Sequence, residues 1–141
     1  MVWQRAMELA VEAYSLAAAL PNDERFGLAR QIKRSAVSVP SNIAEGHERR
    51  STREYARHVA IACGSLAELE TQIELCLRLG FIEPKAVEQC NNLASETGRM
   101  LRAIERSLRA NLGIGEGKAG YGTWDEATAA LPDPSALSPQ P

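Results

Sequence analysis

Apolar residues recur every three or four positions through the first 112 residues of the chain, as they do along one face of an α-helix. In residues 2–20 the repeating positions are Trp3, Met7, Ala10, Tyr14 and Ala17. We expect these side chains to form the buried face of a first helix. Pro21 interrupts the pattern and marks the end of this helix.

The second predicted helix spans residues 24–45 and contains a proline. Its apolar positions are Leu28, Ile32, Ala36, Val39 and Ile43. Asp23 is its expected N-cap, and Gly46 suits a left-handed stop after its last turn. Because the apolar stripe continues through Pro40, which removes a backbone hydrogen bond, we expect one kinked helix rather than two. Nearby polar side chains are expected to bond the backbone groups freed at the kink: Ser38, Ser41 and Asn42.

The third and fourth predicted helices carry the longest apolar repeats. Ser51 and Glu54 form a capping box ahead of a heptad seam. The seam consists of Tyr55, Val59, Ala62, Leu66, Leu69, Ile73 and Cys76. Gly80 ends this helix, and Pro84 opens a fourth helix. The core line of the fourth helix is Val87, Cys90, Ala94, Thr97, Leu101, Ile104 and Leu108.

Four amphipathic helices with short connections predict an all-α, up-down-up-down four-helix bundle over residues 1–112. Residues 113–141 have no sustained period and contain five glycines and four prolines. We interpret them as a flexible, disordered C-terminal tail. No apolar run approaches the roughly 20 residues that a membrane helix requires. Three cysteines without a C-x-x-C pair indicate reduced core residues in a cytoplasmic protein.

The net charge of −2 conceals segments of opposite sign. Residues 24–57 carry +4 and residues 99–112 carry +3, whereas residues 58–98 carry −4 and residues 113–141 carry −3. In an up-down bundle the start of the third helix lies at the same end as the close of the fourth. Acidic residues gather toward the other end, namely Glu68, Glu70, Glu74, Glu83 and Glu88.

This arrangement predicts an arginine-rich end. Thirteen of the sixteen basic residues are arginine, which binds phosphates and carboxylates through two parallel hydrogen bonds. The candidate nucleic-acid-binding residues are Arg49, Arg50, Arg53, Arg57, Arg99, Arg102, Arg106 and Arg109. We expect Arg5 at the same end, and a basic surface that continues along the second helix through Arg30, Lys33 and Arg34. The alternative is a solvated face with ion pairs, such as those between Glu105 and its neighbouring arginines.

Enzymatic motifs are missing from the sequence. The two histidines, His47 and His58, belong to no Glu-x-x-His pair of the kind that di-iron bundles use. Glu54 and His58 are four residues apart, which we interpret as a contact on the helix surface. There is no phosphate-binding loop and no serine, histidine and acid arranged as a triad. We therefore predict no enzyme, no metal site and no cofactor.

One long run of residues is characteristic of a known family. Residues 38–46 read Ser-Val-Pro-Ser-Asn-Ile-Ala-Glu-Gly, and further matching segments are Gln31–Val37, Ala62–Leu66, Glu68–Gln72 and Leu79–Ile82. Over about residues 3–110 the chain resembles the four-helix-bundle family of 23S ribosomal RNA intervening-sequence proteins. The accessory variability determinants of diversity-generating retroelements are relatives of this family.

The resemblance implies a non-enzymatic bacterial bundle that assembles into a homopentamer. It also implies, through the retroelement members, a basic surface for nucleic acid and a reverse transcriptase. The central motif is more plausible as a structural than as a catalytic element, and it consists of Pro40, Ser41, Asn42, Glu45 and Gly46. Glu45 is a hypothetical partner for a basic residue across a subunit boundary.

Two functions follow from these patterns. The first is a non-enzymatic, oligomeric accessory protein that binds structured RNA or DNA through its arginines, together with a reverse transcriptase. The alternative is a protein-only oligomeric scaffold whose arginines contact subunits or partners. In the first case the acidic residues 113–141 are expected to compete with nucleic acid for the arginines.

Overall fold

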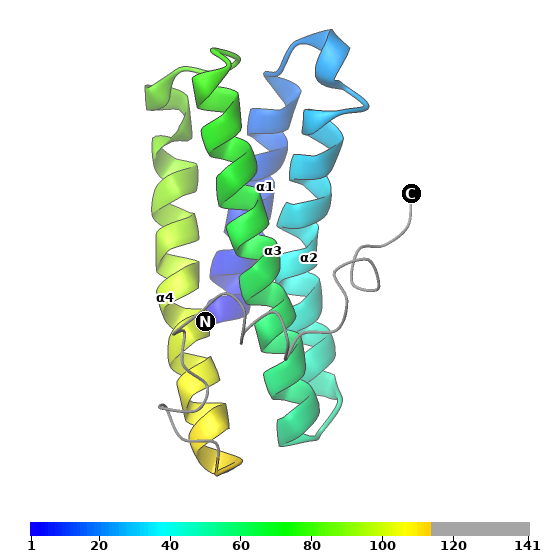
Figure 1. Cartoon of the computed structure of the whole chain (residues 1–141), viewed down its shortest axis with the longest axis vertical. Helices are drawn as coiled ribbons and strands as arrows, with labels where there is room; N and C mark the ends of the chain where they lie inside the picture. Colours follow the sequence, from blue (N-terminus) through cyan, green and yellow to red (C-terminus); the bar gives the residue numbers. More distant parts are fainter. Residues whose placement is uncertain (114–141) are drawn as a thin grey trace, which may run out of the picture.

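Four α-helices contain most of residues 1–113, the part of the chain that the computed structural model describes (Figure 1). The elements are α1 (Val2–Ala18), a 3₁₀ turn η1 (Asn22–Glu24), α2 (Leu28–Glu48), α3 (Thr52–Arg78), a second 3₁₀ turn η2 (Pro84–Val87) and α4 (Glu88–Asn111). After Gly113, the tail expected over residues 113–141 lies outside the described residues.

Consecutive helices run in opposite directions and pack side by side (Figure 1). The helix α2 lies between α1 and α3, and α4 packs against both α3 and α1. As a result, α1 lies diagonally across the bundle from α3. This arrangement confirms the predicted all-α, up-down-up-down bundle. The helix α2 is continuous through Pro40, as the unbroken apolar stripe predicts.

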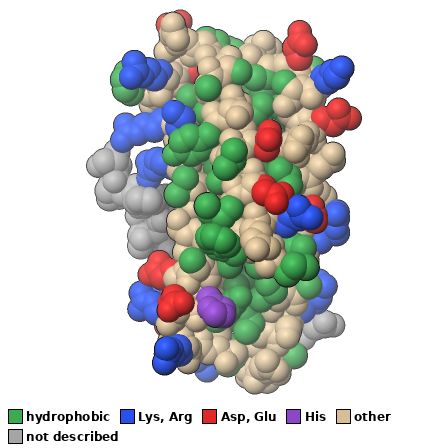
Figure 2. Space-filling model, turned by 180° about the vertical axis from the view of Figure 1, so that it is seen from behind, with side chains coloured by type: hydrophobic (Ala, Val, Ile, Leu, Met, Phe, Trp, Pro, Cys, Tyr) green, Lys and Arg blue, Asp and Glu red, His purple; other side chains and the backbone are tan. Residues whose placement is uncertain are grey.

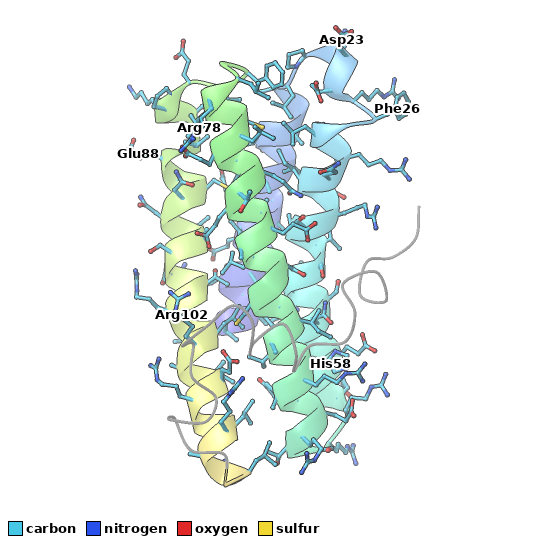
Figure 3. All side chains as sticks on the ribbon, viewed as in Figure 1. Asp23, Phe26, His58, Arg78, Glu88 and Arg102 are labelled. Atoms are coloured by element: carbon cyan, nitrogen blue, oxygen red, sulfur yellow. The ribbon has the colours of Figure 1, made fainter. Side chains whose placement is uncertain are left out.

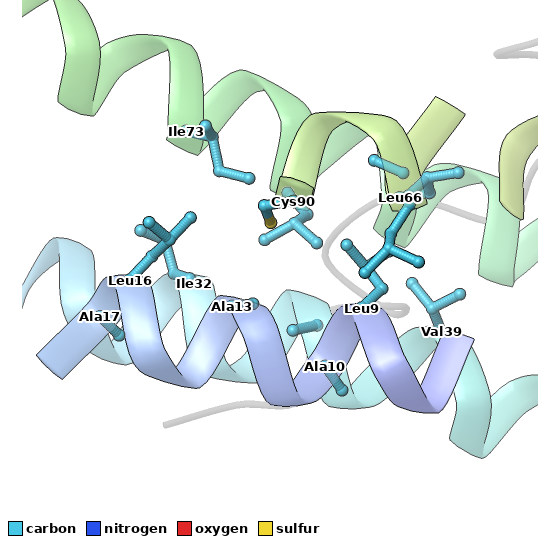
Figure 4. Packing of buried hydrophobic residues seen from close by; sticks show 14 of the residues in the cluster. Leu9, Ala10, Ala13, Leu16, Ala17, Ile32, Val39, Leu66, Ile73 and Cys90 are labelled. Carbon is cyan, nitrogen blue, oxygen red and sulfur yellow. The ribbon is translucent and has the colours of Figure 1, made fainter. Parts of the chain in front are cut away.

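The core consists of the seams predicted on α2, α3 and the first half of α4. Every predicted core residue of α2 is buried, as are the α3 residues from Val59 to Cys76 in the heptad seam. Figure 4 shows Ile32 and Val39 of α2, Leu66 and Ile73 of α3 and Cys90 of α4 in the interior between the helices. Toward the end of α4 the predicted core residues Ile104 and Leu108 are only partly buried, so the core does not extend fully to this end of the helix.

The predicted core face of α1 is correct at Ala10 and Ala17 and wrong at its three large residues. Trp3, Met7 and Tyr14 are 45%, 41% and 47% exposed, and α1 instead buries Ala6, Leu9, Ala13 and Leu16 together with Ala10 and Ala17. Both faces of this helix are apolar at helical spacing, so periodicity alone does not select one. The buried face contains the small alanines, which allow the helix to approach its neighbours closely.

Two helix ends differ from the prediction. The carboxylate of Glu24, rather than that of Asp23, accepts a hydrogen bond at the start of α2, from the backbone N–H of Leu28 at 3.2 Å. Gly46 does not stop α2, which continues to Glu48 before Arg50 adopts a left-handed φ of 55°. Gly80 does end α3 as predicted, with a φ of 73°.

Gly46 instead permits α2 and α3 to approach closely. A Cβ added to Gly46 would lie 2.6 Å from the Cβ of His58, which is closer than real carbon atoms approach. Gly64, in the middle of α3, has no atom within 4 Å of the same position. These two helical glycines therefore have opposite roles.

We expect Gly46→Ala to lower the free energy of unfolding by about 1–3 kcal/mol, because the methyl group forces α2 and α3 apart. Gly64→Ala is the matched control. It should raise stability by up to about 1 kcal/mol, since alanine favours a helix over glycine. Urea denaturation followed by circular dichroism measures both changes. Equal stability of the two variants would show that no close contact exists at Gly46.

Candidate nucleic-acid interface

The α2–α3 connection and the C-terminal end of α4, next to which the two predicted arginine groups fall, lie at the same end of the bundle (Figure 1). One group surrounds the connection between α2 and α3, and the other lies on the second half of α4. We call the eight residues Arg49, Arg50, Arg53, Arg57, Arg99, Arg102, Arg106 and Arg109 the arginine-rich end. Arg5, which was expected at this end, is farther from it, because its Nε lies 3.0 Å from the carboxylate of Glu96, one helical turn before Arg99.

The connection between α2 and α3 is short and well defined. Arg49 is the C-cap of α2, and the left-handed Arg50 turns the chain toward α3. Ser51 then caps α3 as predicted, because its Oγ accepts a hydrogen bond from the N–H of Glu54 at 3.3 Å. The turn leaves Arg50 and Arg53 exposed.

The arginines of α4 lie closer to α3 than the helical spacing indicates. Gly98 and Glu105 are buried on that side of α4, so the buried arc extends toward α3. Arg109 is only 33% exposed and donates to the carboxylate of Glu105 at 3.2 Å. Figure 3 shows Arg102 partway along α4 rather than at its end. Arg99, also on α4, donates to Ser95 Oγ at 2.9 Å.

Most of the arginine-rich end makes no ion pair within residues 1–113. Arg49 pairs with Glu45 at 2.9 Å and Arg57 with Glu54 at 3.6 Å. By contrast, the guanidinium groups without an ion pair in this range are those of Arg50, Arg53, Arg99, Arg102 and Arg106. An exposed guanidinium without a carboxylate partner retains its donors for a phosphate.

Three polar contacts join α2 to α3 along the length of the two helices, and we call them the polar ladder. Ser35 Oγ donates to Gln72 Oε1 at 3.0 Å, and the hydroxyls of Ser38 and Ser65 are 2.7 Å apart. Next to Gly46, His58 Nδ1 lies 3.1 Å from Asn42 Oδ1. Asn42 also donates to the backbone oxygen of Ser38 at 2.8 Å. The oxygen that Pro40 frees is that of Ala36, four residues earlier, so this bond is not the one predicted for Asn42.

The ladder corrects the interpretation of His58. This side chain is 7% exposed and faces α2, so it does not form a surface contact with Glu54 (Figure 3). The sequence does contain a signal for this burial, because the polar residues His58, Ser65 and Gln72 recur every seven positions beside the apolar seam of α3. A polar line at heptad spacing lies along one flank of a helix.

Glu45, in the central motif, has a partner within its own helix. The hydrogen bond from Arg49 lowers the pKa of Glu45, and the positive charges nearby act in the same direction. The role of Glu45 across a subunit boundary stays a prediction.

The cysteines face the interior, as predicted. Cys76 and Cys90 are buried and Cys63 is partly buried, and all three are free thiols. Burial raises the pKa of Cys63 to about 12 and that of Cys90 to about 11, because an apolar environment disfavours the thiolate. Within residues 1–113 no group of histidine, cysteine and acidic side chains is arranged to hold a metal ion.

No helix among the described residues has the length and apolar character needed to cross a membrane.

The fold and the distribution of charged side chains together define a class of protein, namely helical bundles that carry a basic end and an acidic end. Within this class, residues 1–103 match the 23S rRNA-intervening sequence protein family, and the chain belongs to that family.

A solved structure supports the assignment. A protein of unknown function from the S23 ribosomal protein family of Bacteroides thetaiotaomicron is similar, with a TM-score of 0.70 and 29% sequence identity. The similarity covers 75% of this chain and 99% of that one. A comparison with curated proteins finds no match. No enzymatic activity is named for the family or for the solved protein.

We expect the thiols to react slowly in the folded protein. A pKa of about 12 instead of 9.0 leaves Cys63 with about a thousandfold less thiolate at pH 8, and the thiolate is the reactive form. Iodoacetamide labelling followed by mass spectrometry measures the rate, with the urea-unfolded chain as the control. Labelling of folded Cys63 at the unfolded rate would contradict its burial.

Proposed function

We propose that this chain is a non-enzymatic, oligomeric accessory protein that binds structured RNA or DNA through its arginine-rich end. The observation that carries the proposal is that exposed arginines of the α2–α3 connection, Arg50 and Arg53, and of the last turns of α4, Arg106, lie at the same end of the bundle. Phosphate contacts of this kind provide salt-dependent binding with little sequence preference.

The distribution of charge supports this choice of end. Residues 58–98, which carry −4, include the opposite end of the bundle with Glu83 and Glu88. A polyanion approaching the molecule is attracted to one end and repelled by the other, which orients it before contact. The name of the family refers to an intervening sequence of 23S rRNA and is consistent with an RNA partner.

The family resemblance adds two more specific elements to the proposal. One is assembly into a homopentamer, and the other is a reverse transcriptase of a diversity-generating retroelement as a protein partner. The alternative is a protein-only scaffold in which the arginines contact neighbouring subunits. It is favoured by the position of Arg102, which lines a groove between α3 and α4 rather than the end of the bundle.

We expect the double variant Arg53→Glu/Arg106→Glu to bind structured RNA at least about tenfold more weakly at low salt. These two residues are chosen because they are exposed, belong to different helices and make no ion pair within residues 1–113. The slope of log K against log salt should also become shallower by about 1.5, since two phosphate contacts are lost. Fluorescence anisotropy with a labelled RNA hairpin measures both quantities.

The matched control is Arg25→Glu/Lys85→Glu, which changes the net charge equally at the opposite end. It should reduce affinity no more than about twofold, as expected for distant, screened charges. Equal losses in the two variants would indicate a nonspecific charge effect. Absence of wild-type binding to RNA and to duplex DNA at low salt would contradict the proposal. Dissociation of the oligomer by Arg53→Glu/Arg106→Glu would favour the scaffold.

Removal of residues 114–141 should raise RNA affinity. These residues carry −3, and they follow α4 directly, so they compete with phosphates for its arginines. We expect a severalfold increase at low salt that shrinks at higher salt, because salt screens the competition. Anisotropy of the shortened and full chains, at the same RNA concentration, measures the change. Unchanged affinity at low salt would exclude competition by these residues.

A further inference from the structure

Two aromatic side chains meet at the connection between α2 and α3. His47 lies in the last turn of α2 and Tyr55 near the start of α3. Their ring centres are 5.9 Å apart and the ring planes are inclined at 73°, which is an edge-to-face contact. We call these two residues the aromatic pair. In an edge-to-face contact the rings do not lie on each other, so a flat group can still stack on the pair.

The aromatic pair is accessible from the surface. His47 is exposed, and Tyr55 is only partly buried against the core although its position predicts a member of the heptad seam. Figure 2 shows a histidine side chain on the surface toward the lower end of the molecule, among acidic and basic side chains. Within residues 1–113, the imidazole nitrogens of His47 and the hydroxyl of Tyr55 make no hydrogen bond. The pair therefore keeps polar atoms as well as ring surface for a ligand.

Two guanidinium groups lie close to the aromatic pair in the chain. Arg50, with its left-handed φ, lies in the turn between His47 and Tyr55, and Arg53 lies in the first turn of α3. Both arginines are exposed and make no ion pair within residues 1–113. Flat rings next to unpaired guanidinium groups combine the two features that proteins use to bind single-stranded nucleic acid, namely a stacking surface and phosphate contacts.

The carboxylates of this connection do not cancel that positive charge. Glu45 pairs with Arg49 at 2.9 Å, and Glu54 pairs with Arg57 at 3.6 Å. Glu48, at the end of α2, is exposed and makes no ion pair within residues 1–113. A phosphate is therefore attracted to the turn and to the start of α3, and it is repelled by the last residue of α2.

We infer that the aromatic pair stacks an unpaired base of the bound nucleic acid, while Arg50 and Arg53 hold phosphates next to that base. The ligand is then a nucleic acid with unpaired bases, such as a hairpin loop. A continuous duplex does not fit, because its bases are covered by their neighbours in the helix. Since every base has a flat face, the preference is for unpaired bases and not for a sequence. This inference rests on the proposed function and specifies the ligand of the same site.

The test compares two labelled RNAs with the same number of phosphates, a stem-loop and a blunt duplex, by fluorescence anisotropy. The wild type should bind the stem-loop about tenfold more tightly, because a stacked base adds affinity of this order. His47→Ala removes the exposed ring and should abolish most of this preference. Its affinity for the duplex should stay within about twofold of the wild type, since that binding depends on phosphate contacts. His47→Phe should retain the preference, because stacking requires a ring and not a charge.

Phe26→Ala is the matched control. The ring of Phe26 is 77% exposed and lies 5.3 Å from the guanidinium of Arg25, but it is at the opposite end of the bundle (Figure 3). This variant should show the preference of the wild type. A 2-aminopurine base in the loop reports stacking directly. Its emission should be quenched by the wild type and by His47→Phe, and much less by His47→Ala. Circular dichroism verifies that each variant is folded.

The outcomes separate this inference from the proposed function. Equal affinity of the wild type for the stem-loop and the duplex would overturn the inference and leave the proposed function intact. An unchanged preference in His47→Ala, or its loss in His47→Phe, would do the same. If the wild type bound neither RNA at low salt, the proposed function and this inference would both be wrong.

Discussion

The close contact between α2 and α3 determines where the functional surfaces of this bundle lie. Gly46 allows the two helices to approach at His58, and the polar ladder aligns them along their length. Buried hydrogen bonds favour one register because a shift leaves donors and acceptors unpaired. The short connection after Arg49 therefore has a defined position, and the arginines of α3 are held on the same end as those of α4.

The two ends of the bundle carry charge of opposite sign. The arginines of the α2–α3 connection and those of the last turns of α4 lie at one end, while the acidic residues Glu74, Glu83 and Glu88 lie toward the other. The same separation supports the proposed contact with nucleic acid, because phosphates are attracted to positive charge and repelled by negative charge. Arg102 belongs to the arginine-rich end and also lines a groove between α3 and α4.

Much of the fold was predictable from the sequence because three helices have only one apolar face. The seams of α2 and α3, the cap at Ser51 and the stop at Gly80 follow from local patterns. The core face of α1 was not predictable, since both of its faces are apolar and only packing selects between them. Gly46 resembles a helix stop locally, and its role depends on His58 of another helix. The placement of the arginine groups was predictable in outline, but the burial of Glu105 and its effect on Arg109 required the packed structure.

Nuclear magnetic resonance of the arginine side chains provides the most direct test of the central claim, that the arginine-rich end binds nucleic acid. A structured RNA is titrated into the labelled chain while the Nε–H resonances are followed. The account predicts shifts for Arg50, Arg53 and Arg106, with Arg25 and Arg78 unchanged. Shifts concentrated at Arg25 and Arg78, or the absence of any shift at low salt, would contradict it.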